Sequence, residues 1–129
     1  MENKPSILIF VESRYKISRK RVKQTVQRVL ETNGVRTRVE VSIAFVGDRK
    51  MSALNKQFRG KEGTTNILSF PLQEGESTRL PDDVVRLGDI VISYPVLIDE
   101  AAKEEMMVDD RADELVEHGM LHLLGLHHE

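Results

Sequence analysis

The chain has 129 residues, a formal net charge of −2 at pH 7 and no cysteine. This length suffices for one domain with an ordinary hydrophobic core, and the lack of cysteine excludes disulfide bonds and thiolate metal sites. No apolar run approaches the roughly 18 residues that cross a membrane, and the first residues do not form the pattern of a signal peptide. We therefore expect a single domain over residues 1–129 that is cytoplasmic and makes no contact with a membrane.

The charges are distributed unevenly along the chain. Residues 1–66 contain 15 Lys and Arg against 6 Asp and Glu, a balance of +9, whereas residues 67–129 contain 4 against 15, a balance of −11. A basic half could contact the phosphate backbone of a nucleic acid, or the asymmetry could disperse on folding, because halves of a sequence need not become faces. The same two interpretations, phosphate contacts or a solvated face, apply to a basic cluster at Arg19, Lys20, Arg21 and Lys23.

The first half of the chain predicts two strands and two helices. The apolar run of residues 6–11 is typical of a strand covered on both faces. Ser18 is a candidate N-cap for a helix that ends at Asn33-Gly34, and residues 38–46 alternate between apolar and polar side chains as in a second strand. A second helix follows Gly47-Asp48 and ends at Gly60. The side chains expected to face inward are Val22, Thr25, Val26, Val29 and Leu30 on the first helix and Met51, Leu54 and Phe58 on the second.

The second half predicts two further strands and two further helices. Residues 67–71 and 88–93 are expected to form short strands, the first ended by Pro71, and residues 73–87 a polar connection of a length typical of functional or mobile loops. Pro95 suits the start of a helix that runs to about residue 106, and Asp109 opens the last helix, where carboxylates complement the helix dipole. The expected inner faces are Leu97, Ile98, Ala101 and Ala102, then Ala112, Leu115, Val116, Gly119 and Leu123.

The resulting order of elements, β-α-β-α-β-β-α-α, predicts an α+β fold, that is, an α/β sandwich. We expect a four-stranded mixed sheet with about four helices, the last of which is a zincin-like histidine helix near the C-terminus. Asp89, at the start of the fourth strand, could be a metal ligand, although an aspartate in such a position more often forms a turn.

All four histidines lie within the last twelve residues. His118 and His122 are four residues apart, so on a helix they share one face and can bind one metal ion from adjacent turns. Gly125 supplies the left-handed residue that ends helices, after which His127 or His128 can return to the same ion. Three neutral imidazoles with a fourth position open to water are typical of a catalytic zinc site.

Two other interpretations of the histidines fit the pattern less well. A single histidine on an apolar helix is usually a core residue, but here four occur within eleven residues. A purification tag is an uninterrupted run, whereas apolar residues separate these histidines. Between residues 120 and 124 the helix is apolar on nearly every side except at His122, so we expect a buried helix end with the metal ion at the wall of a dry cleft.

The histidine segment resembles the signature of the YbeY endoribonucleases, the bacterial ribosomal-RNA maturation factors. The matching residues are His118, Gly119, Leu121, His122, Leu123, Gly125 and His128, whereas His127 stands where the family usually has Asp. A second segment is similar at Leu54, Asn55, Arg59, Lys61, Thr65, Leu68, Ser69, Phe70 and Pro71, with Phe58, Glu62 and Asn66 in place of Tyr, Asp and Asp. Gly88-Asp89-Ile90 and Ile92-Ser93 match a third block, and the resemblance extends over residues 38–128.

The resemblance implies a metal-dependent, single-strand-specific endoribonuclease that acts in rRNA maturation and ribosome quality control. It implies one divalent metal ion, for which zinc is the first candidate, bound by His118, His122 and His128; imidazoles also admit nickel or copper. Arg59 would be functional, as a phosphate-binding guanidinium, although taken alone it would be a surface residue near a helix end. The implied partners are rRNA and the small ribosomal subunit or its assembly factors.

Two alternative functions are open: a zincin-like metallohydrolase of another class, such as a peptidase, and a non-catalytic ribosome-assembly factor with a structural metal ion. In the zincin motif H-E-x-x-H a glutamate follows the first histidine and acts as general base, so Gly119 in that position counts against a peptidase. The metal ion would then activate water itself or act as a Lewis acid. His127 could orient a ligand, be a fourth ligand or be exposed.

Overall fold

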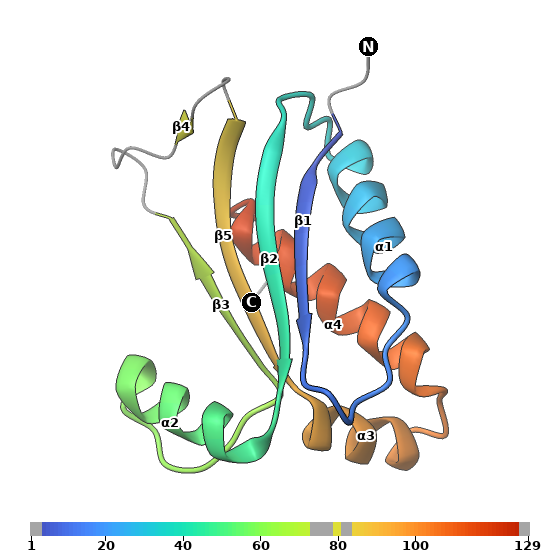
Figure 1. The fold of residues 1–129 in the computed structure, drawn as a ribbon, viewed down its shortest axis with the longest axis vertical. Helices are drawn as coiled ribbons and strands as arrows, with labels where there is room; N and C mark the ends of the chain where they lie inside the picture. Colours follow the sequence, from blue (N-terminus) through green and yellow to red (C-terminus); the bar gives the residue numbers. More distant parts are fainter. Residues whose placement is uncertain (1–3, 73–78, 81–83, 127–129) are drawn as a thin grey trace.

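The computed structural model describes residues 4–72, 79–80 and 84–126. In this part of the chain four helices and a mixed β-sheet form an α+β fold, which confirms the predicted class (Figure 1). The strands are β1 (Ser6–Val11), β2 (Val39–Val46), β3 (Ile67–Pro71), the two-residue β4 (Arg79–Leu80) and β5 (Val84–Ser93). The helices are α1 (Arg19–Thr32), α2 (Asp48–Arg59), α3 (Tyr94–Lys103) and α4 (Val108–Leu123). None of these described helices is long and apolar enough to span a membrane.

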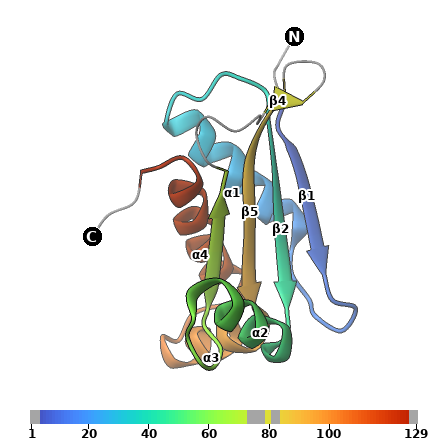
Figure 2. The same ribbon diagram turned by 90° about the vertical axis from the view of Figure 1, so that its left-hand side faces the viewer.

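The main strands of the sheet follow the order β1-β2-β5-β3. β1, β2 and β5 are parallel to one another, β3 is antiparallel to β5, and the short β4 also pairs with β5. Figure 2 shows α1 and α4 together on one face of this sheet, and α2 and α3 at the end where the parallel strands terminate. β3 ends this order of strands and lies in contact with α4.

The main core lies between the sheet and the two helices that cover it. Alternation along β2 buries four side chains to 2% exposure or less: Val39, Val41, Ile43 and Phe45. The predicted stripe of α1 is buried in full, and the predicted inner face of α4 is buried with Met120 in addition. A helix buries its apolar stripe because this removes the stripe from water. The periodic patterns of the sequence therefore determine how these two helices pack.

The basic helix α1 lies beside the acidic start of α4 (Figure 1). Arg21 forms ion pairs with Asp110 at 2.7 Å and with Asp113 at 2.6 Å. Arg28 pairs with Glu117 at 3.4 Å. Pairs as exposed as these stabilise the fold little. They show, however, that part of the charge asymmetry of the sequence is cancelled by contact between the two halves.

The strand predicted for residues 88–93 begins earlier, at Val84. Glu40 of β2 lies opposite Arg86, whereas Val41 lies opposite Gly88, so Leu87 is an extra residue in β5. Such a β-bulge bends a strand without ending it. The sequence prediction was wrong because the glycine was taken as the start of the strand. The predicted connection of residues 73–87 contains β4 and the start of β5, and its other residues lie outside the described part.

Three side chains that were expected to face inward are exposed: Phe58 of α2 and Ile98 and Ala102 of α3. Both helices lie at the end of the sheet rather than across its face (Figure 2), so each buries only a narrow stripe. The buried residues are Met51 and Asn55 on α2 and Leu97 and Ala101 on α3. α3 also ends at Lys103, before the predicted residue 106.

Gly88 permits the bulge, and its substitution tests this part of the fold. Its φ of +141° is rare for residues with a side chain, and a Cβ atom here would lie 2.3 Å from the carbonyl oxygen of Phe70 on β3. We expect Gly88→Ala to lower the free energy of unfolding by about 2–4 kcal/mol, because backbone strain and the clash with β3 add. Urea unfolding followed by circular dichroism measures this loss.

Gly34→Ala is the matched control for Gly88→Ala. Gly34 also has a positive φ, +70°, but a Cβ atom there would meet nothing within 4 Å. This variant should lose only about 1 kcal/mol, from the unfavourable φ alone. An equal loss in both variants would contradict the contact between β5 and β3 as the cause.

Candidate active site

Two histidines of α4 lie side by side near its C-terminal end. The ring centroids of His118 and His122 are 4.6 Å apart and their planes are inclined by 57°. They occupy successive turns on one face of the helix, as residues four apart must. The predicted shared face is therefore confirmed, and both imidazoles can approach one point in space.

The chain reverses directly after this pair of histidines. Gly125 has a φ of +77°, in the left-handed region. Its N–H donates to the carbonyl oxygen of His122 at 3.0 Å, and the N–H of Leu126 donates to that of Leu121 at 2.7 Å. This pair of hydrogen bonds is a Schellman motif, which ends helices at glycine. The predicted end at Gly125 is thus confirmed, whereas His127 and His128 lie outside the described residues.

The two histidines open onto a pocket of about 540 Å³ at the outer strand β3. Residues from three elements line it: the end of α2, the strand β3 with the segment before it, and α4. The lining residues are Phe58, Arg59, Thr65, Asn66, Ile67, Leu68, Ser69, Phe70, His118 and His122. Arg59 therefore lies in the same pocket as His118 and His122, although it is separated from them by about 60 residues of sequence.

This pocket is a surface site and not a dry cleft. His118 is exposed, and His122, Leu121 and Leu124 are only partly buried. The sequence prediction of a fully buried helix end was wrong because α4 passes the edge of the sheet at β3, where no further element covers its outer side in the described part. A large substrate would not need the protein to open before it could reach these side chains.

The packing of α4 against the sheet explains why position 119 is a glycine, which the histidine motif alone does not reveal. The residue is buried against β5, and a Cβ atom on it would lie 2.9 to 3.1 Å from three side-chain atoms of Ile90. Position 119 therefore faces the sheet and has no room for a long side chain. A glutamate there, as in the zincin motif, could not enter the pocket as a general base.

Arg59 is the last residue of α2 and is exposed. Among the described residues it has no hydrogen-bond or ion-pair partner, so its guanidinium is available to an anion. The loop that follows is held by Asn55, whose side-chain amide donates to the carbonyl oxygen of Gly63 at 3.0 Å. Asn55 is 3% exposed, and it thereby fixes the chain between Arg59 and the β3 wall of the pocket. Sequence reasoning missed this role of Asn55. Its position one turn after Met51, on the inner face of the helix, could have indicated it.

A second polar contact sets the wall of the pocket at Asn66. The Nδ2 atom of Asn66 donates to Oε2 of Glu100 at 3.2 Å. Arg111 of α4 donates to Oε1 of Glu100 from Nε at 3.1 Å and from Nη2 at 2.8 Å. Partial burial lowers the pKa of Arg111, but its hydrogen bonds to Glu100 and Glu114 outweigh this effect and raise the pKa. Sequence reasoning missed Glu100 and Arg111, because only the fold brings them to Asn66.

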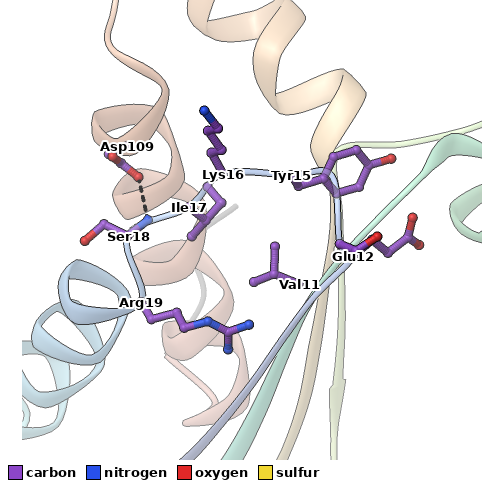
Figure 3. A pocket seen from close by; sticks show the side chains of 9 residues that line it. Val11, Glu12, Tyr15, Lys16, Ile17, Ser18, Arg19 and Asp109 are labelled. Atoms are coloured by element: carbon purple, nitrogen blue, oxygen red, sulfur yellow. Dashed lines mark hydrogen bonds between the residues drawn. The ribbon is translucent and has the colours of Figure 1, made fainter.

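A separate hollow lies at the start of α1, where the basic cluster of the sequence begins (Figure 3). The N–H of Ser18 donates to Oδ1 of Asp109 at 3.1 Å, so a carboxylate of the protein already lies at this helix end. Arg19 donates from Nη1 to the carbonyl oxygen of Ile9 at 2.7 Å, and Arg21 pairs with carboxylates of α4. Two of the four basic residues thus have partners within the protein, which favours the interpretation without phosphate contacts.

The aspartate predicted as a metal ligand or a turn former lies within a strand and forms no turn. Asp89 lies within β5, where its Oδ1 accepts a hydrogen bond from Ser42 at 2.5 Å, and Arg86 lies at 3.9 Å. It does not line the pocket of the histidines. Among the described residues no three His, Cys, Asp or Glu side chains converge on a possible metal position. The described residues fit two imidazole ligands of a metal ion, and the proposed third, His128, is outside them.

Comparison with known proteins shows which proteins this chain resembles. The family model described as Endoribonuclease YbeY matches residues 9–129. A protein named Endoribonuclease YbeY from Syntrophus aciditrophicus is 36% identical over 118 residues, which are 92% of this chain and 72% of the relative. One of the same name from Anaeromyxobacter is 44% identical over 94 residues, 73% of this chain and 46% of the relative. A solution structure of a Thermotoga maritima protein matches with a TM-score of 0.58 at 26% identity, over 95% of this chain and 75% of the other.

Proposed function

The chain belongs to the YbeY family of endoribonucleases, and on this basis we propose that it cleaves single-stranded RNA in the cytoplasm. Its role would be rRNA maturation and ribosome quality control, with the small ribosomal subunit or its assembly factors as partners. The observation that supports this proposal best is the convergence of Arg59, His118 and His122 on one surface pocket. A cation for phosphate and a pair of imidazoles for a metal ion are then within reach of the same stretch of RNA.

His118 and His122, together with His128, would hold one divalent metal ion, with zinc as the first candidate. When bound, such an ion supplies Lewis-acid chemistry or an activated water at neutral pH. The adjacent turns of α4 hold the two imidazoles, and the Schellman motif at Gly125 ends the helix before His127 and His128 in the sequence. His127 could orient one of these ligands, be a fourth ligand or remain exposed.

Arg59 would bind the phosphate that is to be cleaved. A guanidinium donates two parallel hydrogen bonds to phosphate oxygens and keeps its charge at any physiological pH. It can stabilise the negative charge that grows on these oxygens during cleavage. Arg59 lines the pocket together with His118 and His122, and the loop that follows it is fixed by Asn55. The RNA backbone would then lie between Arg59 and the histidines.

The two other functions remain as outcomes of the test. A peptidase would need a general base, and position 119 cannot provide one because it faces Ile90. Any other carboxylate would have to approach the pocket from beyond its described lining, which contains no Asp or Glu. A non-catalytic assembly factor with a structural metal ion would share the histidines, but its fold would depend on the ion.

The experiment is an RNA-cleavage assay before and after removal of metal by a chelator, on protein whose metal content has been measured. We expect cleavage of a single-stranded RNA to stop after chelation and to return with zinc, while circular dichroism and the midpoint of urea unfolding change little. The same sequence annealed to its complement is the control and should be cleaved slowly. Global unfolding on chelation would indicate a structural ion, and cleavage of a peptide panel would indicate a peptidase.

A further inference from the structure

Phe58 is an exposed aromatic side chain near the end of α2. It is 55% exposed although it belongs to a helix whose other large apolar residues, Met51 and Leu54, pack toward the sheet. Its ring meets that of Phe70 edge to face, with centroids 5.1 Å apart and an angle of 67°. This contact fixes the ring on one side and leaves most of the rest accessible to solvent. The accessible part of the ring is therefore free to stack on a flat group of a bound ligand.

The position of Phe58 in the pocket identifies the kind of partner. Phe58 and Arg59 are consecutive residues, and both line the pocket that contains His118 and His122. Nucleotides alternate a charged phosphate with a flat apolar base, and proteins that bind unpaired strands place aromatic rings beside cationic side chains to match this alternation. We propose that Phe58 forms a nucleobase subsite, on which one unpaired base of the RNA stacks while Arg59 binds the neighbouring phosphate.

Asn66 provides a polar edge for the same subsite. It lines the pocket together with Phe58, and its Nδ2 atom is engaged by Glu100, which Arg111 holds from its other oxygen. Because a carboxylate only accepts hydrogen bonds, Glu100 fixes which end of the carboxamide is turned toward it. The carbonyl oxygen Oδ1 of Asn66 does not take part in this hydrogen bond. In the proposed subsite it would accept a hydrogen bond from a base amino group.

This inference rests on the proposed RNA cleavage and adds a reason for a preference for single strands. A base in a duplex is stacked and paired, so it cannot turn onto Phe58, whereas an unpaired base can. The ring of Phe58 thereby contributes a discrimination that a contact with phosphate alone does not make, because such a contact reads the backbone and not the base.

The chain contains no tryptophan, so a single tryptophan can report on this ring. In a Phe58→Trp variant, titration with a single-stranded RNA oligonucleotide should quench the tryptophan fluorescence, because the indole stacks on a base. Phe10→Trp is the matched control: Phe10 is 60% exposed, but it lies on β1, at the opposite end of the strand order from β3. Its fluorescence should not change. Quenching of both variants to the same extent, or of neither, would overturn the subsite.

Cleavage assays distinguish stacking on the aromatic ring of Phe58 from a merely apolar contact. Phe58→Tyr keeps the ring and should retain activity, whereas Phe58→Leu keeps an apolar side chain and should raise KM for single-stranded RNA roughly 5- to 100-fold. Activity of Phe58→Leu on an oligonucleotide with abasic sites should equal that of the parent protein, because neither can stack there. If the parent cleaves RNA and Phe58→Leu is equally active, the subsite is wrong while the proposed function stands. If the parent binds no RNA in an anisotropy titration, the proposed function itself fails.

Discussion

A variant with both His118→Ala and His122→Ala is expected to bind no divalent metal at neutral pH and to lose RNA cleavage by about 100-fold or more. Two of the three proposed ligands disappear, and a lone imidazole binds zinc weakly. The fold should persist, because His118 is exposed and His122 is only partly buried, so their truncation leaves no closed cavity in the core. Metal analysis of the dialysed protein, a cleavage assay and urea unfolding measure the three expectations.

Single variants of the other two histidines complete this test. His128→Ala should also lose the metal ion, whereas His127→Ala should retain it. Stoichiometric zinc in the variant that lacks both His118 and His122 would contradict the assignment. Loss of metal in His127→Ala with retention in His128→Ala would exchange the roles of these two neighbours, and the site on α4 would be kept.

The elements that the sequence predicted well are those with an uninterrupted period. β2 alternates strictly, and the stripe of α1 repeats at three and four residues, so burial of one face leaves a single arrangement for each. Ser18 caps α1 as predicted, with its hydroxyl oxygen accepting a hydrogen bond from the N–H of Arg21 at 3.2 Å. Such features depend only on residues that are close together in the sequence. They can therefore be predicted from the sequence alone.

The errors occurred where the burial of a residue depends on distant elements. Phe58 continues the apolar spacing of α2, but α2 extends past the end of the sheet and nothing in the described part covers this residue fully. Ile98 of α3 is exposed for the same reason. Gly88 interrupts β5 only as a bulge, and the requirement for glycine comes from Phe70 on the neighbouring strand. Periodicity in the sequence shows which apolar side chains share one face of an element. It does not show which other element covers that face.

The candidate site also contains features that the local sequence predicts and features that depend on distant elements. The pairing of His118 with His122 follows from helix geometry, and the turn at Gly125 follows from the preference of glycine for positive φ. The approach of Arg59 does not follow from any local rule. It requires β3 to pair antiparallel with β5, which places the segment after α2 beside α4. In the sequence, only the resemblance to a family pointed to Arg59. The fold explains how this residue reaches the pocket of the histidines.

Replacement of Arg59 is expected to separate catalysis from metal binding. Arg59→Ala should lower kcat/KM for single-stranded RNA about 100- to 1000-fold, because it removes donors aimed at the charge that develops on the phosphate. Arg59→Lys should lose most of the same activity, since an ammonium is a point charge and cannot donate in a fork. Both variants should keep their metal content and their unfolding midpoint, because Arg59 is exposed and has no partner in the described part of the protein.

Arg49 offers the matched control for these variants, because it is exposed on the first turn of the same helix and does not line the pocket. Arg49→Ala removes the same charge from α2, so a general electrostatic attraction for RNA would weaken equally in both positions. We expect it to retain nearly full activity at 0.15 M salt, where exposed charges are largely screened beyond about 8 Å. If Arg59→Lys is as active as the parent, two-pronged phosphate binding is wrong, and charge alone suffices. If Arg59→Ala is also fully active, Arg59 is a surface residue, and the catalytic groups are confined to the histidines.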